Sequence, residues 1–146
     1  IFPSSMREDY PVNGKKTYFS GGGGLVSTSM DYMKFASIFL NNGNFKDKNL
    51  LDSATVQLMT TPQSDSLYVN NNQQLKFGYG GSVQLSEDEF GRVKGRFGWG
   101  GYFQTIYWVD QERGIVGIML TNARNTPMWG QLFDRFEQIV NNAVIE

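Results

Sequence analysis

The residues best suited to chemistry lie in one short stretch, where glycines surround a tryptophan. The sequence "GRFGWGGYF" places Gly98, Gly100 and Gly101 around Trp99 and directly before Tyr102. Glycine permits a bulge or a tight bend, and it also lets a ligand come close enough to bond to main-chain N–H groups. Both interpretations are open on the residues alone, and Trp99 fits a core position as well as a ligand-facing one.

Composition excludes several kinds of catalytic site. The 146 residues contain no histidine and no cysteine, which rules out a Ser-His-Asp triad, a Cys-His pair and any His-ligated metal within them. Lys and Arg total 13 against 14 Asp and Glu, so there is no basic field for nucleic acid. We expect small neutral ligands or ligands held by hydrogen bonds, and any acid–base catalysis must come from Lys, Tyr, Asp or Glu.

Other patterns with chemical potential are weak. None of the eleven serines has a lysine three residues later, so the histidine-free Ser-x-x-Lys pair is absent. The triplets at 16–18 and 68–70 resemble Lys-Thr-Gly and Tyr-x-Asn only loosely. "SGGGGL" at 20–25 lacks the lysine of a phosphate-binding loop and favours a flexible turn. The acidic run 87–89 is typical of a solvated hairpin tip, and we expect no metal there.

Two helices precede the glycine-rich region. Thr28, followed by Asp31, predicts an N-cap, and helical spacing of apolar residues continues until "NNG" at 41–43. A second helix is predicted after the N-cap Asp52, with Leu51 and Val56 placed for a hydrophobic staple. Residues 1–24 are expected to form an extended lead-in, and residues 63–74 a polar loop.

The remaining pattern is strands followed by a helix. We expect strands in "KFGYGGSVQL", in "YFQTIYWV" from Tyr102 onward and in "GIVGIMLTN", the last two forming a hairpin around "DQERG". Thr126 is the predicted N-cap of the final helix, with Pro127 at its first position. Its apolar stripe should cover one face of the sheet and consists of Trp129, Leu132, Phe133, Phe136, Ile139, Val140 and Val144. The predicted class is α+β, an antiparallel sheet flanked by helices.

The order of these motifs resembles one family. "FSGGGGLVSTSMDYMKFASIFLNNG", "LLDSATVQLMTTPQ", "FGYGGSVQL" and "FGWGGYFQTIYWVDQERGIVGIMLTN" together are similar to the C-terminal part of the serine β-lactamase-like superfamily. That group includes class C β-lactamases, D-Ala-D-Ala carboxypeptidases and related esterases. The resemblance spans about residues 19 to 122. It implies that residues 1–146 form the C-terminal portion of one β-lactamase/transpeptidase-like catalytic domain, with 1–24 leading into the helices and strands of 25–146.

The resemblance also implies a site. In this family a Ser-x-x-Lys supplies nucleophile and base, and a Tyr-x-Asn handles a second proton. A third motif on a strand is Lys-Thr-Gly, His-x-Gly or Trp-Gly-Gly, which Trp99, Gly100 and Gly101 match. These three residues are implied to bind substrate, and the backbone N–H of Tyr102 to form one half of an oxyanion hole. No cofactor is implied.

The expected parent protein is a serine hydrolase that cleaves ester or amide bonds through an acyl-enzyme, while this chain alone, without Ser-x-x-Lys, is expected to be inactive. An indole cannot attract a substrate carboxylate, so uncharged or bulky acyl groups are favoured over β-lactams. Expected partners are a small ester, amide or peptidoglycan-like substrate and the N-terminal half of the same domain. The chain alone should self-associate. Family habit implies a periplasmic or secreted protein.

Two alternatives remain open. The first is a non-enzymatic module whose aromatic residues Trp99, Tyr102, Tyr107 and Trp108 bind carbohydrate or a peptidoglycan-like ligand. Alternation along a strand places Tyr107 and Trp108 on opposite faces, so not all four can line one surface. The second alternative is a family member that has lost catalysis and kept the fold.

Overall fold

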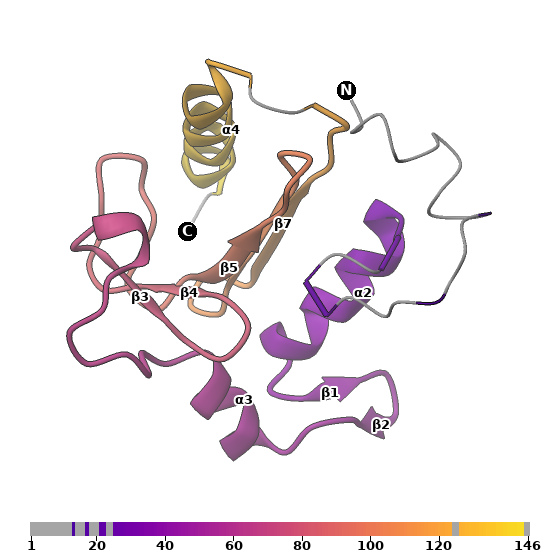
Figure 1. Ribbon diagram of the computed structural model, residues 1–146. Coiled ribbons are helices and arrows are strands. Elements are labelled where there is room, and N and C mark those ends of the chain that lie inside the picture. The colour runs from indigo at the N-terminus through magenta and orange to yellow at the C-terminus, as the bar shows by residue number, and fades with distance from the viewer. Residues whose placement is uncertain (1–12, 14–16, 18–20, 23–24, 124–125, 145–146) are drawn as a thin grey trace.

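Five antiparallel strands form a meander in which neighbours along the chain are also neighbours in the sheet (Figure 1). The computed structural model describes residues 13, 17, 21–22, 25–123 and 126–144. The strands, in sheet order, are β3 Leu75–Phe77, β4 Ser82–Gln84, β5 Phe97–Gly100, β6 Ile106–Asp110 and β7 Ile115–Met119. The class is therefore α+β, as the sequence predicts.

Helices cover both faces of this sheet. Helix α2 (Ser29–Leu40) packs on β6 and β7, and α4 (Trp129–Ala143) lies on the opposite face (Figure 1). Tyr107 contacts α2 through Tyr32 and Phe35, whereas Trp108 contacts Phe133 and Phe136 of α4. The predicted alternation of Tyr107 and Trp108 is confirmed.

Local signals at both ends fix α2. The Thr28 hydroxyl accepts the N–H of Asp31 at 3.2 Å, which confirms the predicted N-cap. At the other end Asn42 has a φ of 51°, and the N–H of Gly43 donates to Ile38 O at 2.8 Å, which together close the helix. Gly43 is required there, since its φ is +95° and a Cβ would lie 1.9 Å from Leu51 O.

The second helix, α3 (Ser53–Met59), also begins where the sequence predicts. The Asp52 carboxylate accepts the N–H of Thr55 at 2.7 Å. Val56 is buried in the core, and Leu51 packs against the same cluster, which fits the predicted staple. A small hairpin, β1 (Asn44–Phe45) and β2 (Lys48–Asn49), connects α2 to α3. The sequence does not predict it, because two residues a strand show no alternation.

The apolar core lies between the sheet and α2. Phe39 of α2 contacts Phe97 of β5, whose ring also lies near Tyr107 of β6. Full burial of one such side chain contributes about 1.5–3 kcal/mol. The buried members of the cluster are Ala36, Phe39, Val56, Val83, Phe97, Tyr107 and Val109.

The final helix differs from its prediction. It begins at Trp129, its N-cap position is Met128, and no side chain caps it, so Thr126 is not the N-cap. Phe133 and Phe136 face the sheet, but Leu132 and Ile139 of the predicted stripe are exposed. Their places on the buried face are taken by polar side chains of Glu137 and Asn141.

The strand prediction around Tyr102 is also wrong. The glycines Gly98 and Gly100 lie in β5 and end a strand instead of starting one. Residues 102–105 are a turn, closed by the N–H of Gly101 donating to Thr105 O at 2.8 Å, and β6 begins only at Ile106. Within the predicted polar loop, residues Val69–Asn71 form a 3-10 turn (η1) and Tyr68 bridges to Lys76. The lead-in lies mostly outside the described residues.

Candidate functional site

The end of β5 and the turn after it bring the implied site residues to one corner of the sheet. Trp99 pairs with Tyr107 and Gly100 with Ile106 of β6. Gly101 starts the turn, and Tyr102 follows within it. Trp99 is 42% exposed and Tyr102 is 60% exposed. The corner therefore offers an indole and a run of main chain to solvent.

Backbone conformation or lack of space explains why three of the four glycines in this region are glycine. Gly95 has a φ of +86°, a conformation that other residues rarely adopt. A Cβ at Gly98 would lie 2.3 Å from Tyr107 O and 2.9 Å from Trp108 Cα. A Cβ at Gly101 would lie 2.3 Å from the Thr105 hydroxyl oxygen. The hairpin itself accounts for these positions.

Gly100 is different. Apart from Gly100 and its two chain neighbours, the only heavy atom of the described residues within 4 Å of a Cβ built there is Thr105 O, at 3.5 Å, which is an ordinary contact. No positive φ requires glycine either. The described part of the fold therefore has room for a side chain at Gly100, and the main chain there is open enough for close approach of a ligand.

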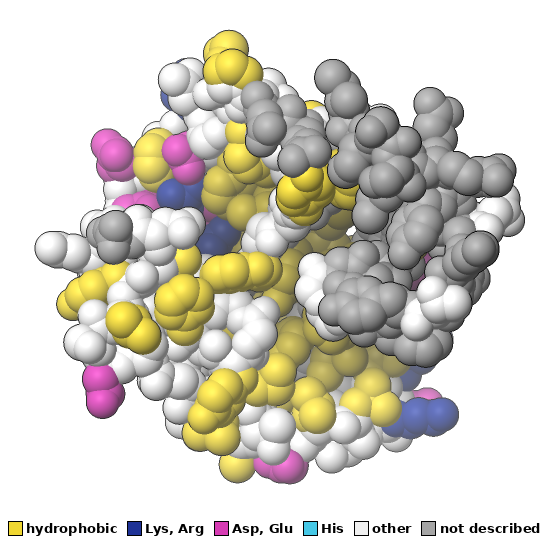
Figure 2. Space-filling view, viewed as in Figure 1, with side chains coloured by type: hydrophobic (Ala, Val, Ile, Leu, Met, Phe, Trp, Pro, Cys, Tyr) yellow, Lys and Arg dark blue, Asp and Glu magenta, His cyan; other side chains and the backbone are white. Residues whose placement is uncertain are grey.

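One aromatic neighbour joins Trp99 at the surface. The rings of Phe77 and Trp99 are 5.9 Å apart between centroids and inclined at 47°. We call these two residues the aromatic corner. Figure 2 shows hydrophobic side chains gathered over the end of the sheet where β3, β4 and β5 lie. The sequence indicated Trp99 but not Phe77, because the contact joins strands that are separated by β4.

The four-residue aromatic platform is contradicted by the structure. Tyr107 is 6% exposed and Trp108 is 1% exposed, so neither lines a binding surface. Burial, with a smaller contribution from Tyr32, raises the pKa of the Tyr107 hydroxyl well above its usual range.

The weaker motifs have structural roles or lie outside the described residues. Tyr68 carries the Lys76 ammonium 5.4 Å above its ring, and Asn70 has a φ of 51° within η1. Lys16, Tyr18 and residues 23–24 are outside the described part of the chain. Over the described ranges, no group of three or more carboxylate, His or Cys side chains could hold a metal ion.

The acidic run is only partly the solvated tip that was expected. The Asp88 carboxylate is largely buried and accepts the N–H groups of Phe90 and Arg92 at 3.0 and 3.1 Å. It also forms an ion pair with the Arg92 guanidinium at 3.2 Å. The Asp88 carboxylate therefore stabilises the turn by bonding to residues of the same loop.

Asp88 belongs to a charged cluster that the sequence does not predict. Glu137 of α4 is fully buried and accepts hydrogen bonds from Arg96 and from Arg92, the latter at 2.7 Å. Burial lowers the pKa of Arg96. Burial alone would also lower the pKa of Arg92, but Asp134 and Glu137 outweigh it and raise that pKa. These contacts fasten α4 to the loop between β4 and β5.

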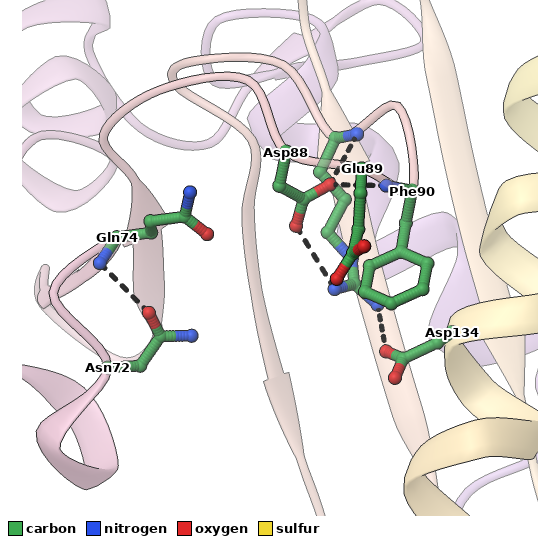
Figure 3. Close-up of a pocket in the computed structure, with 7 residues that line it drawn as sticks. Asn72, Gln74, Asp88, Glu89, Phe90 and Asp134 are labelled. Carbon is green, nitrogen blue, oxygen red and sulfur yellow. Dashed lines mark hydrogen bonds and ion pairs between the residues drawn. The ribbon is translucent and has the colours of Figure 1, made fainter.

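A cavity of about 410 Å³ opens beside this cluster. In Figure 3, Asn72 and Gln74 lie on one side of it and Asp88, Glu89 and Phe90 on the other. Its remaining lining residues are Arg92 and Asp134, which form an ion pair. It shares no lining residue with Trp99–Tyr102, and two of its three carboxylates are paired with Arg92.

Comparison with known proteins places the chain. The β-lactamase family model matches residues 3–135. The chain belongs to the β-lactamase family. The N-acetylmuramyl-L-alanine amidase of Bacillus subtilis (strain 168) is 26% identical over 128 residues, which cover 80% of this chain and 27% of that protein. The chain thus spans about a quarter of the length of this curated relative.

Solved structures agree on the fold. Unliganded simvastatin synthase (LovD) of Aspergillus terreus, a selenomethionyl derivative, matches with a TM-score of 0.62 and 25% identity over 75% of this chain and 32% of that one. A Bacteroides dorei DSM 17855 protein described as a β-lactamase matches with a TM-score of 0.51 and 20% identity over 78% of this chain and 41% of its own. The resemblance to the serine β-lactamase-like fold is confirmed. No helix in the described ranges is long and apolar enough to cross a membrane.

Proposed function

We propose that this β-lactamase-family chain forms one wall of the active site of a serine hydrolase that cleaves ester or amide bonds through an acyl-enzyme. The observation that carries the proposal is Gly100, an exposed strand glycine without a steric reason, between Trp99 and the turn that contains Tyr102. Membership of the β-lactamase family supports the proposal. The name of the Bacillus relative also supports it, because an amidase cleaves amide bonds. The nucleophile and base would come from a Ser-x-x-Lys outside these 146 residues.

The chemistry assigned to this wall is stabilisation of charge. When a serine oxygen attacks the substrate carbonyl, the carbonyl oxygen becomes an oxyanion, and its charge falls as the leaving group departs with a proton. The N–H of Tyr102 is proposed to donate to that oxyanion, with Trp99, Gly100 and Gly101 binding the substrate beside it. One such donor contributes about 10²–10³ in turnover. Water then cleaves the acyl-enzyme and restores the serine.

The neutral indole of Trp99 favours uncharged or bulky acyl groups over substrates that carry a carboxylate. Lys76 of β3 does not supply the positive charge that Trp99 lacks, because its ammonium donates to Asp65 O at 2.6 Å and lies over the Tyr68 ring. Efficient β-lactam hydrolysis is not expected. A peptidoglycan-like amide is a second substrate class, supported by the muramyl group in the relative's name. It would suit an exported protein.

We propose the N-terminal half of the same domain as the partner of this chain. Apolar side chains at the start of α2 and just before it are exposed, including Leu25, Val26 and Met30. Such a surface is normally covered by protein. Expressed alone, the 146 residues should therefore associate into dimers or larger assemblies.

The deciding experiment is intact mass after treatment with a fluorophosphonate, which labels activated serines. We expect a single stoichiometric adduct on the complete gene product and none on the 146-residue chain. An adduct on the isolated chain would mean that one of its own serines is activated, and the assignment of the wall would fail. A complete protein without an adduct would favour a family member that has lost catalysis.

A further inference from the structure

We infer that Phe77 is a specificity-determining residue of this site and that the aromatic corner selects longer apolar acyl groups over acetyl. The inference rests on the proposed function, since it concerns the same active-site wall. It adds a residue that lies outside the Trp99–Tyr102 stretch and commits the site to one class of acyl group.

Both main-chain polar groups of Phe77 bond to Gln63 and Ser64. Its N–H donates to the Ser64 hydroxyl at 3.1 Å, and its carbonyl accepts the N–H of Gln63 at 2.7 Å. The next residue, Gly78, is packed so tightly that a Cβ would lie 2.3 Å from Met59 O. Because strand β3 ends in these contacts, the position of Phe77 is set before any ligand arrives.

Both rings of the aromatic corner are partly exposed to solvent. Phe77 is 37% exposed and Trp99 is 42% exposed, and the 47° inclination between the rings leaves an angled apolar surface. Trp99 is followed by Gly100, where the main chain is open. In the proposed binding mode, a carbonyl group bonded near Gly100 and Tyr102 places its acyl substituent against the two rings.

Length and charge of that substituent decide how much apolar area it covers. An acetyl group has only one methyl carbon beyond the carbonyl, whereas a longer chain can lie along the rings of Trp99 and Phe77. Each additional methylene buried against the rings should raise kcat/KM by about fourfold. A terminal carboxylate would lose its hydration against the rings, and Lys76, the neighbour of Phe77, is occupied by Asp65 O and Tyr68.

The test is a comparison of two neutral esters with the complete gene product. The ratio of kcat/KM for p-nitrophenyl hexanoate over p-nitrophenyl acetate should be well above one in the wild type. Phe77→Ala should lower this ratio by about tenfold, the effect of losing contact with a methylene or two. Phe77→Leu, which keeps an apolar side chain, should lower it by about threefold and serves if the alanine variant does not fold.

Tyr79→Ala is the matched control. Tyr79 is a similarly exposed aromatic two residues away, and among the described residues its ring makes no contact with Trp99. The hexanoate-to-acetate ratio of kcat/KM in Tyr79→Ala should stay at the wild-type value. Unchanged ratios in folded, active Phe77 variants would overturn the role of Phe77 and leave the proposed hydrolase standing. A wild-type protein that turns over neither ester and takes no fluorophosphonate would overturn both.

Discussion

Two helices close the two faces of the same sheet by different physical means. On the α2 face, rings and aliphatic side chains such as Phe39, Phe97 and Val109 fill the interface. On the α4 face, Trp108 and Phe133 share the interface with Glu137 and its arginines. Apolar contacts tolerate changes of shape when volume is kept, whereas a buried charge depends on each partner. Conservative substitutions should therefore cost little on the α2 face and considerably more on the α4 face.

Glu137→Gln should have the largest effect. The substitution keeps the shape of the side chain but leaves Arg96, which is buried, without its counter-charge. Loss of one partner of a buried pair costs about 3–5 kcal/mol. Urea unfolding followed by circular dichroism would measure it, with Glu112→Gln on the exposed surface as the control. A loss below about 1 kcal/mol would show that the charged face is no more demanding than the apolar one.

Gly98→Ala is expected to come next. Gly98 lies opposite Trp108 in the sheet, and the added methyl group would meet the main chain of β6. Overpacking of this kind costs about 1–3 kcal/mol. Gly100→Ala, two residues along the same strand, should change the free energy of unfolding by less than about 0.5 kcal/mol.

The same pair of variants separates fold from function. If the main chain at Gly100 is approached by substrate, Gly100→Ala should lower kcat/KM of the complete gene product while its unfolding midpoint stays unchanged. An equally stable and fully active Gly100→Ala protein would remove the main support for the proposed site.

Phe39→Leu tests the tolerant face. Phe39 packs against Phe35 and Phe97, and leucine keeps most of the apolar volume at the cost of the ring contacts. We expect a loss of about 1 kcal/mol, measured in the same urea titration. A loss equal to that of Glu137→Gln would erase the difference between the faces.

The smallest expected effect is a pH dependence of stability at Asp52, the N-cap of α3. The pKa of Asp52 is lowered, first by the N–H of Thr55 and then by its hydroxyl. A depressed carboxyl pKa gives stability that is present above the ordinary aspartate range and is lost as pH falls through the folded-state pKa. The free energy of unfolding should fall less between pH 6 and pH 3 in Asp52→Asn than in the wild type, because asparagine caps a helix without titrating. Identical slopes would contradict this assignment.

The sequence predicts the elements whose signals are local. Caps and closing residues of α2 and α3 act within four residues, and they are where the sequence places them. The start of α4 and the burial of Glu137 could not be predicted, because its partners Arg92 and Arg96 lie more than 40 residues earlier. The sequence predicts a strand over residues 102–105 because aromatic and β-branched residues are typical of strands. The main-chain hydrogen bond that closes the turn there leaves no signal in the residue types.

The candidate site was predicted to a similar extent. Trp99-Gly100-Gly101 is visible as a motif, and the family it indicates is confirmed. Phe77 is 22 residues earlier and reaches Trp99 only through the folded sheet. Its contact with Trp99 is a property of strand arrangement, which spacing along the chain does not reveal. The roles of Trp99, Gly100, Gly101 and Tyr102 stay predictions.

The sequential order of the meander has a consequence for folding. Each strand from β3 to β7 pairs with the next strand along the chain, so its contacts close short loops, which is the arrangement associated with fast folding. The hairpin of β5 and β6 can form before distant segments arrive. The main chain at Gly100 and Tyr102 would then acquire its geometry early. Under the proposed function, the segment that carries the nucleophile would pack against a site wall that has already folded.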